Sequence, residues 1–181
     1  SAVISVAMER GVRRQQTSIN TIFFLAKGTV DTGEGMKPTE RALFSMSYAI
    51  PAIRIDVTRQ KVRSIEVATG ALAWNESEPG IGATKVAESA ADRLRQVWLT
   101  PQGALRAMVD ARAKDPQAVA IEQSGDHTTF TMRFGGGPLE VVVDATHRPQ
   151  RVKWTLPNEV YEAEFSNYKD WELLDVFFPQ K

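Results

Sequence analysis

Residues 118–134, AVAIEQSGDHTTFTMRF, contain two runs of alternating apolar and polar residues separated by Gly125 and Asp126. Alternation with a period of two predicts β-strands, and a glycine with an aspartate between two such runs predicts a hairpin turn. Four more alternating runs follow at 139–144, 151–156, 160–165 and 171–178. Because only antiparallel strands can be joined by turns of two to five residues, this half of the chain predicts a large antiparallel meander.

The first half of the chain adds strands, and helices stand at its start and in the middle of the sequence. Period-two patterns predict strands from residue 21 and over 41–47, 52–58, 62–69 and 72–74. Helical spacing of apolar residues predicts helices at 2–16, 83–99 and 104–114, and Thr100 and Pro101 form an N-cap and first helical residue for the last of these. Helices grouped between runs of strands indicate an α+β fold.

The composition narrows the class of protein. With 181 residues, 43% of them hydrophobic and 24% charged, the sequence predicts one globular domain over residues 1–181. Lys plus Arg and Asp plus Glu balance at 22 each, which argues against nucleic acid or an anionic membrane as a partner. The absence of cysteine excludes disulfides and thiolate zinc sites. No apolar run approaches the roughly 20 residues of a membrane span.

Both ends of the sequence suggest neighbouring segments. The start lacks an initiator Met and a charged leader region, so any signal peptide would have been removed before Ser1. The last residues, from Phe177 to Lys181, stop inside or just after a predicted strand. One interpretation is therefore that the single domain is a segment of a longer protein.

Residues that could carry catalysis are few. The two histidines, His127 and His147, have no zinc-binding spacing around them. Gly135 begins a glycine-rich turn followed by a strand, whereas a phosphate loop requires a helix N-terminus after it. Glu162 and Glu164 share one face of a strand, where solvent exposure is the ordinary explanation. We expect no catalytic residue, metal or cofactor; a hydrolase using His127, or Glu162 with Glu164, is the weakest alternative.

Aromatic residues are distributed over nearly every predicted strand. Core packing would account for most of them, but a strongly curved sheet has a concave face that can hold an apolar ligand. The candidate lining residues are Phe24, Ile55, Trp74, Phe130 and Trp154. Two hypotheses follow, namely a binding module for an apolar ligand and a structural or interaction domain whose own side chains fill the cavity.

Several short motifs carry a family resemblance over most of the chain. These are Arg54-Ile55-Asp56, the strand from Gly70 to Trp74 before the central helices, FSNYKD at 165–170 and VFFP at 176–179. In this order they resemble the bacterial lipoprotein-carrier superfamily of the LolA and LolB type. The resemblance implies a strongly curved antiparallel sheet, an incomplete barrel closed by a few helices, with an apolar lining that accepts lipid acyl chains. It also implies a periplasmic or secreted protein and makes Arg54 the candidate for the carriers' functional arginine.

The resulting prediction is non-enzymatic binding of a lipid or other apolar ligand in the concave face of a curved sheet, in the cell envelope. The alternative is a structural or interaction domain of a larger envelope protein. The expected partners are therefore a lipid or apolar small molecule and other envelope proteins, with no nucleic acid.

Overall fold

The computed structural model describes residues 20–31, 35–171 and 176–180. The chain divides into two compact units, which we call the N-terminal unit (Asn20–Val97) and the C-terminal unit (from Trp98 onward). The expectation of a single domain stays a prediction. The helix expected at residues 2–16 lies outside the described residues.

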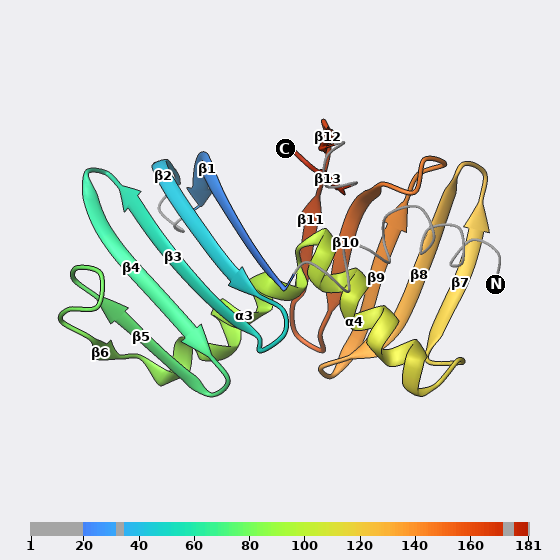
Figure 1. The fold of residues 1–181 in the computed structure, drawn as a ribbon, viewed down its shortest axis with the longest axis horizontal. Helices are drawn as coiled ribbons and strands as arrows, with labels where there is room; N and C mark the ends of the chain where they lie inside the picture. Colours follow the sequence, from blue (N-terminus) through green and yellow to red (C-terminus); the bar gives the residue numbers. More distant parts are fainter. Residues whose placement is uncertain (1–19, 32–34, 172–175, 181) are drawn as a thin grey trace. The chain divides into compact units, whose positions relative to one another are not determined.

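The N-terminal unit is a six-stranded antiparallel sheet in which each strand pairs with the next one along the chain (Figure 1). Its strands are β1 (Thr21–Asp31), β2 (Met36–Ser47), β3 (Ala52–Arg59), β4 (Val62–Thr69), β5 (Leu72–Glu76) and β6 (Thr84–Lys85). A short 3-10 helix, η2 (Ala87–Ser89), leads into helix α3 (Ala90–Trp98). The strands predicted between residues 21 and 74 are therefore confirmed.

One face of this sheet forms a core with α3, and we call it the inner face. Ile53, Ile55 and Val57 alternate along β3, are almost fully buried, and belong to the same apolar cluster as Ala90 and Val97 of α3. The alternation follows from the strand itself, since successive side chains point to opposite faces. The opposite, outer face carries the polar residues of β3.

The predicted helix at 83–99 is wrong in its first third. Thr84 and Lys85 pair with Asn75 and Trp74 of β5, and the Val86 N–H donates to the carbonyl of Ala73 at 2.9 Å. These backbone groups bond to a neighbouring strand, so they are not available for helical hydrogen bonds. Sequence periodicity could not reveal this competition, because the partner strand is supplied by the tertiary fold.

A buried arginine attaches α3 to the sheet. Arg93 is 8% exposed, and its guanidinium donates to the carbonyls of Val67 (3.1 Å) and Trp74 (2.8 Å) and to Oδ1 of Asn75 (2.6 Å). A buried cation is tolerated when its donors are satisfied in this way. The contacts fix the helix over β4 and β5.

The described residues of the C-terminal unit form a five-stranded antiparallel sheet, one helix and a separate strand pair (Figure 1). Helix α4 (Pro101–Lys114) is followed by β7 (Val119–Ser124), β8 (His127–Phe134), β9 (Gly137–Val143), β10 (Pro149–Thr155) and β11 (Val160–Glu164). In place of one strand at 171–178, β12 (Lys169–Trp171) and β13 (Val176–Phe178) pair with each other, and residues between them are not described.

Helix α4 begins where the sequence predicts. Thr100 has an extended backbone, its Oγ1 accepts the Gly103 N–H at 3.1 Å, and Pro101 occupies the first helical position. This arrangement satisfies one of the amide groups that a helix start leaves unpaired. Apolar residues of α4 and the sheet then form the core of the unit, among them Leu105, Met108, Leu139 and Val141.

The predicted hairpin turns are confirmed, and they explain the short connections. Ser124 pairs with His127 around Gly125, whose φ of +58° suits glycine. Phe134 pairs with Gly137 around Gly135 and Gly136. The α+β class with antiparallel sheets is thus confirmed. The incomplete barrel is not, because the described strands form sheets of six, five and two members, none of them strongly curled.

Candidate binding surfaces

An aromatic pair lies on the inner face of the N-terminal sheet, at its β1 edge. Phe24 is opposite Phe44 in the strand register, and Phe44 is opposite Ile55, so the three side chains form a row across β1, β2 and β3. The rings of Phe24 and Phe44 are stacked with centroids 4.8 Å apart and planes within 10°. Phe44 packs against the buried core, whereas Phe24 remains 37% exposed. The apolar row therefore leads from the core to an accessible ring.

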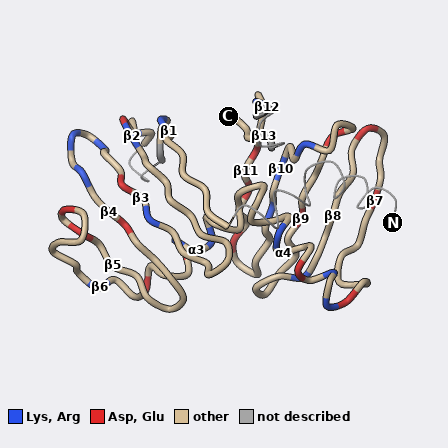
Figure 2. Tube along the Cα trace, in the orientation of Figure 1, with Lys and Arg blue, Asp and Glu red and all other residues tan. Residues whose placement is uncertain are grey.

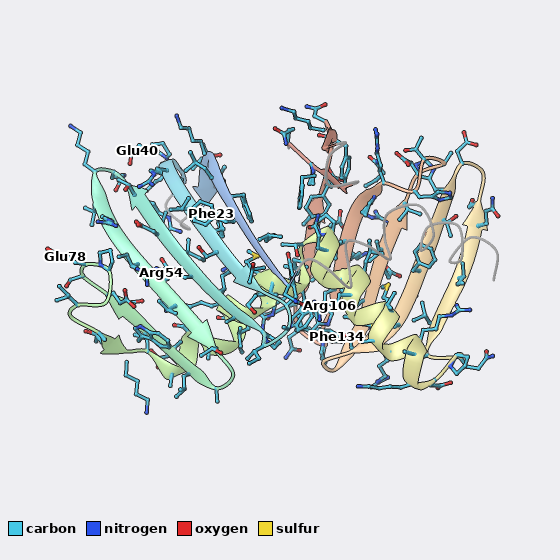
Figure 3. The ribbon with its side chains drawn as sticks, viewed as in Figure 1. Phe23, Glu40, Arg54, Glu78, Arg106 and Phe134 are labelled. Atoms are coloured by element: carbon cyan, nitrogen blue, oxygen red, sulfur yellow. The ribbon has the colours of Figure 1, made fainter. Side chains whose placement is uncertain are left out.

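The outer face of β1 is also apolar. Phe23 and Leu25 flank Phe24 in sequence, point to the opposite face, and are 68% and 57% exposed. Figure 3 shows Phe23 on β1 and Arg54 on β3. Edge strands are usually protected by charge or by a covering element, so exposed apolar side chains on an edge strand indicate a contact surface.

Arg54 and Trp74, two of the predicted site residues, meet on this outer face around a carboxylate. In the register, Arg54 and Trp74 are both opposite Val67 of β4. The carboxylate belongs to Glu76 at the end of β5: its Oε2 accepts from Arg54 Nη1 at 2.7 Å and its Oε1 from Trp74 Nε1 at 2.9 Å. Gly80 N–H donates a third bond, at 2.8 Å, to Oε2.

This environment stabilises the charged form of Glu76. The Gly80 amide, then the Arg54 guanidinium and the Trp74 indole, lower the pKa of Glu76 from 4.5 to about 2. The residue itself is only 8% exposed. Because three donors engage its oxygen atoms, the carboxylate is a poor proton acceptor and a poor ligand. The geometry therefore favours a structural role, in which Glu76 clamps the loop after β5, rather than a role in acid or base chemistry.

Phe130 and Trp154 lie in the core of the C-terminal unit. Both belong to the cluster that packs with α4, and Trp154 Nε1 donates to the carbonyl of Phe134 at 3.0 Å. The Phe134 ring contacts Trp154 and Trp98, with centroids 5.3 and 5.2 Å away. These aromatic residues fill the interior of their own unit.

The six predicted ligand-binding residues therefore occupy three places. Phe24 and Ile55 share the inner face of the first sheet, Arg54 and Trp74 share its outer face, and Phe130 and Trp154 are buried under α4. Arg54 and Ile55 are neighbours on one strand, and strand alternation alone places them on opposite faces. Their role in ligand binding stays a prediction.

Two residues that sequence reasoning did not select, Phe44 and Glu76, complete these sites. Phe44 could have been found from the pairing of β2 with β1, because a hairpin places its aromatic residues opposite one another. Glu76 carried no such signal, since its partners come from β3, β5 and the following loop.

The described residues contain no group of His, Asp and Glu side chains arranged to hold a metal ion. Basic and acidic residues are interspersed over both sheets (Figure 2), in agreement with the zero formal net charge. Within the same part of the chain, none of the helices has the length and apolar character needed to cross a membrane.

No family model and no curated protein matches the chain. Among solved structures, it is similar to the CwlD amidase from Clostridioides difficile in complex with the GerS lipoprotein, with a TM-score of 0.35 and 10% sequence identity. The alignment covers 94% of this chain and 96% of that chain. At this TM-score the likeness carries no argument about function, and membership of the lipoprotein-carrier superfamily stays a prediction.

Proposed function

We propose that this protein is a non-enzymatic binding module of the cell envelope that holds a lipid or other apolar ligand against Phe24 and Phe44. The observation that carries the proposal is the apolar row on the inner face, which runs from the buried Ile55 to the exposed ring of Phe24. A ligand seated there would extend the core outward across the edge of the sheet. The short motifs that resemble lipoprotein carriers support an acyl chain as the ligand.

The energy available at this surface is modest for each residue. Burying a fully exposed large apolar side chain contributes about 1.5–3 kcal/mol. Because Phe24 is 37% exposed, covering its ring would contribute roughly a third of that, or about 0.5–1 kcal/mol. Measurable affinity therefore requires a ligand that is long enough to cover neighbouring residues as well. An acyl chain has this length, and a small solute does not.

The test combines native mass spectrometry with thermal unfolding. Protein purified from cells should carry a lipid, and added fatty acid should raise its melting temperature, since a ligand that binds only the folded state stabilises it. Phe24→Ser should reduce both effects, because a loss of about 0.5–1 kcal/mol corresponds to roughly two- to fivefold weaker binding. Phe23→Ser is the matched control, because it changes the adjacent, more exposed phenylalanine on the opposite face. Absence of bound lipid in the wild type together with no thermal shift would overturn the proposal.

A second candidate function is an interaction domain of a larger envelope protein. The specific observation in its favour is the exposed pair Phe23 and Leu25 on the outer face of β1. For this function the roles of the two variants are exchanged: Phe23→Ser should reduce the recovery of a cross-linked envelope protein, and Phe24→Ser should not. Equal recovery with the wild type and Phe23→Ser would exclude it.

A further inference from the structure

A groove of about 540 Å³ lies on the face of the C-terminal sheet opposite α4. Val142, Arg151 and Glu164 form a row across β9, β10 and β11, because Arg151 is opposite Val142 on one side and Glu164 on the other. The strand neighbours of Val142 point into the core with α4, so this row faces away from that core. The volume is in the range of sites for small molecules.

A bulge in β10 shapes one end of the groove. The register of β10 with β9 shifts between Pro149 and Arg151, which leaves Gln150 as an extra residue. The Gln150 side chain lines the groove, and its Nε2 donates to Oδ2 of Asp144 at 2.7 Å. Asp144 Oδ1 also accepts from the Thr146 and Arg148 amides, at 2.8 and 3.0 Å. The wall is therefore held in place by its own hydrogen bonds.

The groove combines one positive charge, one negative charge and apolar side chains. Arg151 and Glu164 are directly opposite each other, yet among the described residues neither forms an ion pair within 4.0 Å. Val142 is half-buried and supplies an apolar surface beside them, whereas Phe165, which also lines the groove, packs against the core cluster of the α4 face. His127, at the start of β8, also lines the groove.

We propose that this groove binds a zwitterionic molecule with an apolar part. Its carboxylate or phosphate contacts Arg151, its ammonium group contacts Glu164, and its apolar portion lies on Val142. A purely anionic ligand would be repelled by the negative charge of Glu164. A purely apolar ligand would leave the side chains of Arg151 and Glu164 desolvated and unpaired. Arg151 suits either anion, because a guanidinium binds carboxylate and phosphate through paired donors.

This chemistry has two sources, an apolar amino acid and an ethanolamine phospholipid headgroup. The probes are L-phenylalanine, dihexanoyl phosphatidylethanolamine below its micelle concentration, and hexanoate as an anion without an ammonium group. Binding is measured by isothermal titration calorimetry and by backbone amide shifts of β10 and β11. At least one zwitterion should bind and hexanoate should not. Binding of phenylalanine assigns a free amino acid; binding of the phospholipid alone assigns the headgroup.

The variants Arg151→Gln and Glu164→Gln should each weaken binding of that zwitterion at least tenfold. The matched controls are Lys153→Gln and Glu162→Gln, which change the next oppositely charged pair along the same two strands, outside the groove. They should leave the affinity within twofold of the wild type. If neither zwitterion binds, or if the control pair weakens binding as much as the groove pair, the proposal fails. The groove residues do not include Phe24, so the proposal for the groove and the proposal for the Phe24–Phe44 surface can fail independently.

Discussion

Replacing Gly137 with alanine adds one methyl group where strands β9 and β10 meet. The new Cβ would overlap the carbonyl oxygen of Thr155, and it would lie 2.9 Å from the carbonyl carbon of Thr155 and 3.4 Å from Cα of Leu156. These are backbone atoms, so the conflict cannot be relieved by rotating a side chain. The end of β10, which lies next to the Trp154 ring in the core, must therefore move away from β9.

We expect a loss of about 3 kcal/mol in the free energy of unfolding, the upper end of the usual range for overpacking, because backbone must shift. Propensity alone predicts the opposite sign, since alanine in a strand interior is about 0.5–1 kcal/mol better than glycine. The matched control is Gly125→Ala in the preceding hairpin, where nothing lies within 4 Å of the added Cβ and the φ of +58° is the only cost. That left-handed backbone costs about 1–2 kcal/mol, partly offset by the reduced entropy of the unfolded chain.

The assay is urea unfolding followed by tryptophan fluorescence, for which Trp154 is a local reporter. Gly137→Ala should destabilise the protein by at least 1 kcal/mol more than Gly125→Ala. The slope of the unfolding free energy against urea concentration should be the same for both variants. Equal or smaller destabilisation by Gly137→Ala would show that Leu139 of β9 does not lie opposite Trp154 of β10.

Three further predictions concern Glu76, helix α4 and the core. Folding lowers the pKa of Glu76, so the stabilisation from its clamp is complete above pH 4.5 and is lost as the pH falls toward 2. The difference in unfolding free energy between the wild type and Glu76→Gln should therefore shrink over that interval. A difference that does not depend on pH would contradict the clamp. Thr100→Ala should lower the unfolding free energy by about 1 kcal/mol, and Thr100→Ser should retain most of it, as measured by chemical unfolding. Leu139→Ala should cost about 2–5 kcal/mol because the side chain is fully buried, whereas Val160→Ala, at an exposed position, should cost less than about 0.5 kcal/mol.

Much of the secondary structure was predictable because its causes are local. The predicted strand 127–134 coincides with β8, and the start of α4 follows from Thr100 and Pro101. The helix at 83–99 was predicted too long because Thr84 and Lys85 bond to β5, a partner that periodicity does not include. The strand at 171–178 was predicted as one element where two short paired strands, β12 and β13, are described.

The candidate sites were predicted less well, because a site depends on which faces come together. Aromatic content indicated Phe24 and Trp74, but strand alternation separates them onto opposite faces of one sheet. Glu76 was not found because its carboxylate becomes a clamp only when a loop amide and the distant side chain of Arg54 converge on it beside the indole of Trp74.

The sequence by itself determined the alternating strands, the glycine hairpins and the start of α4, since each depends on residues within a few positions of one another. The tertiary structure decided which strands share a sheet, which face α3 and α4 cover, and where Glu76 and the bulge at Gln150 place their side chains. These features depend on strand register and packing between distant segments. A shift of one residue in register would move every side chain to the other face, so only the folded chain specifies the surfaces at which binding is proposed.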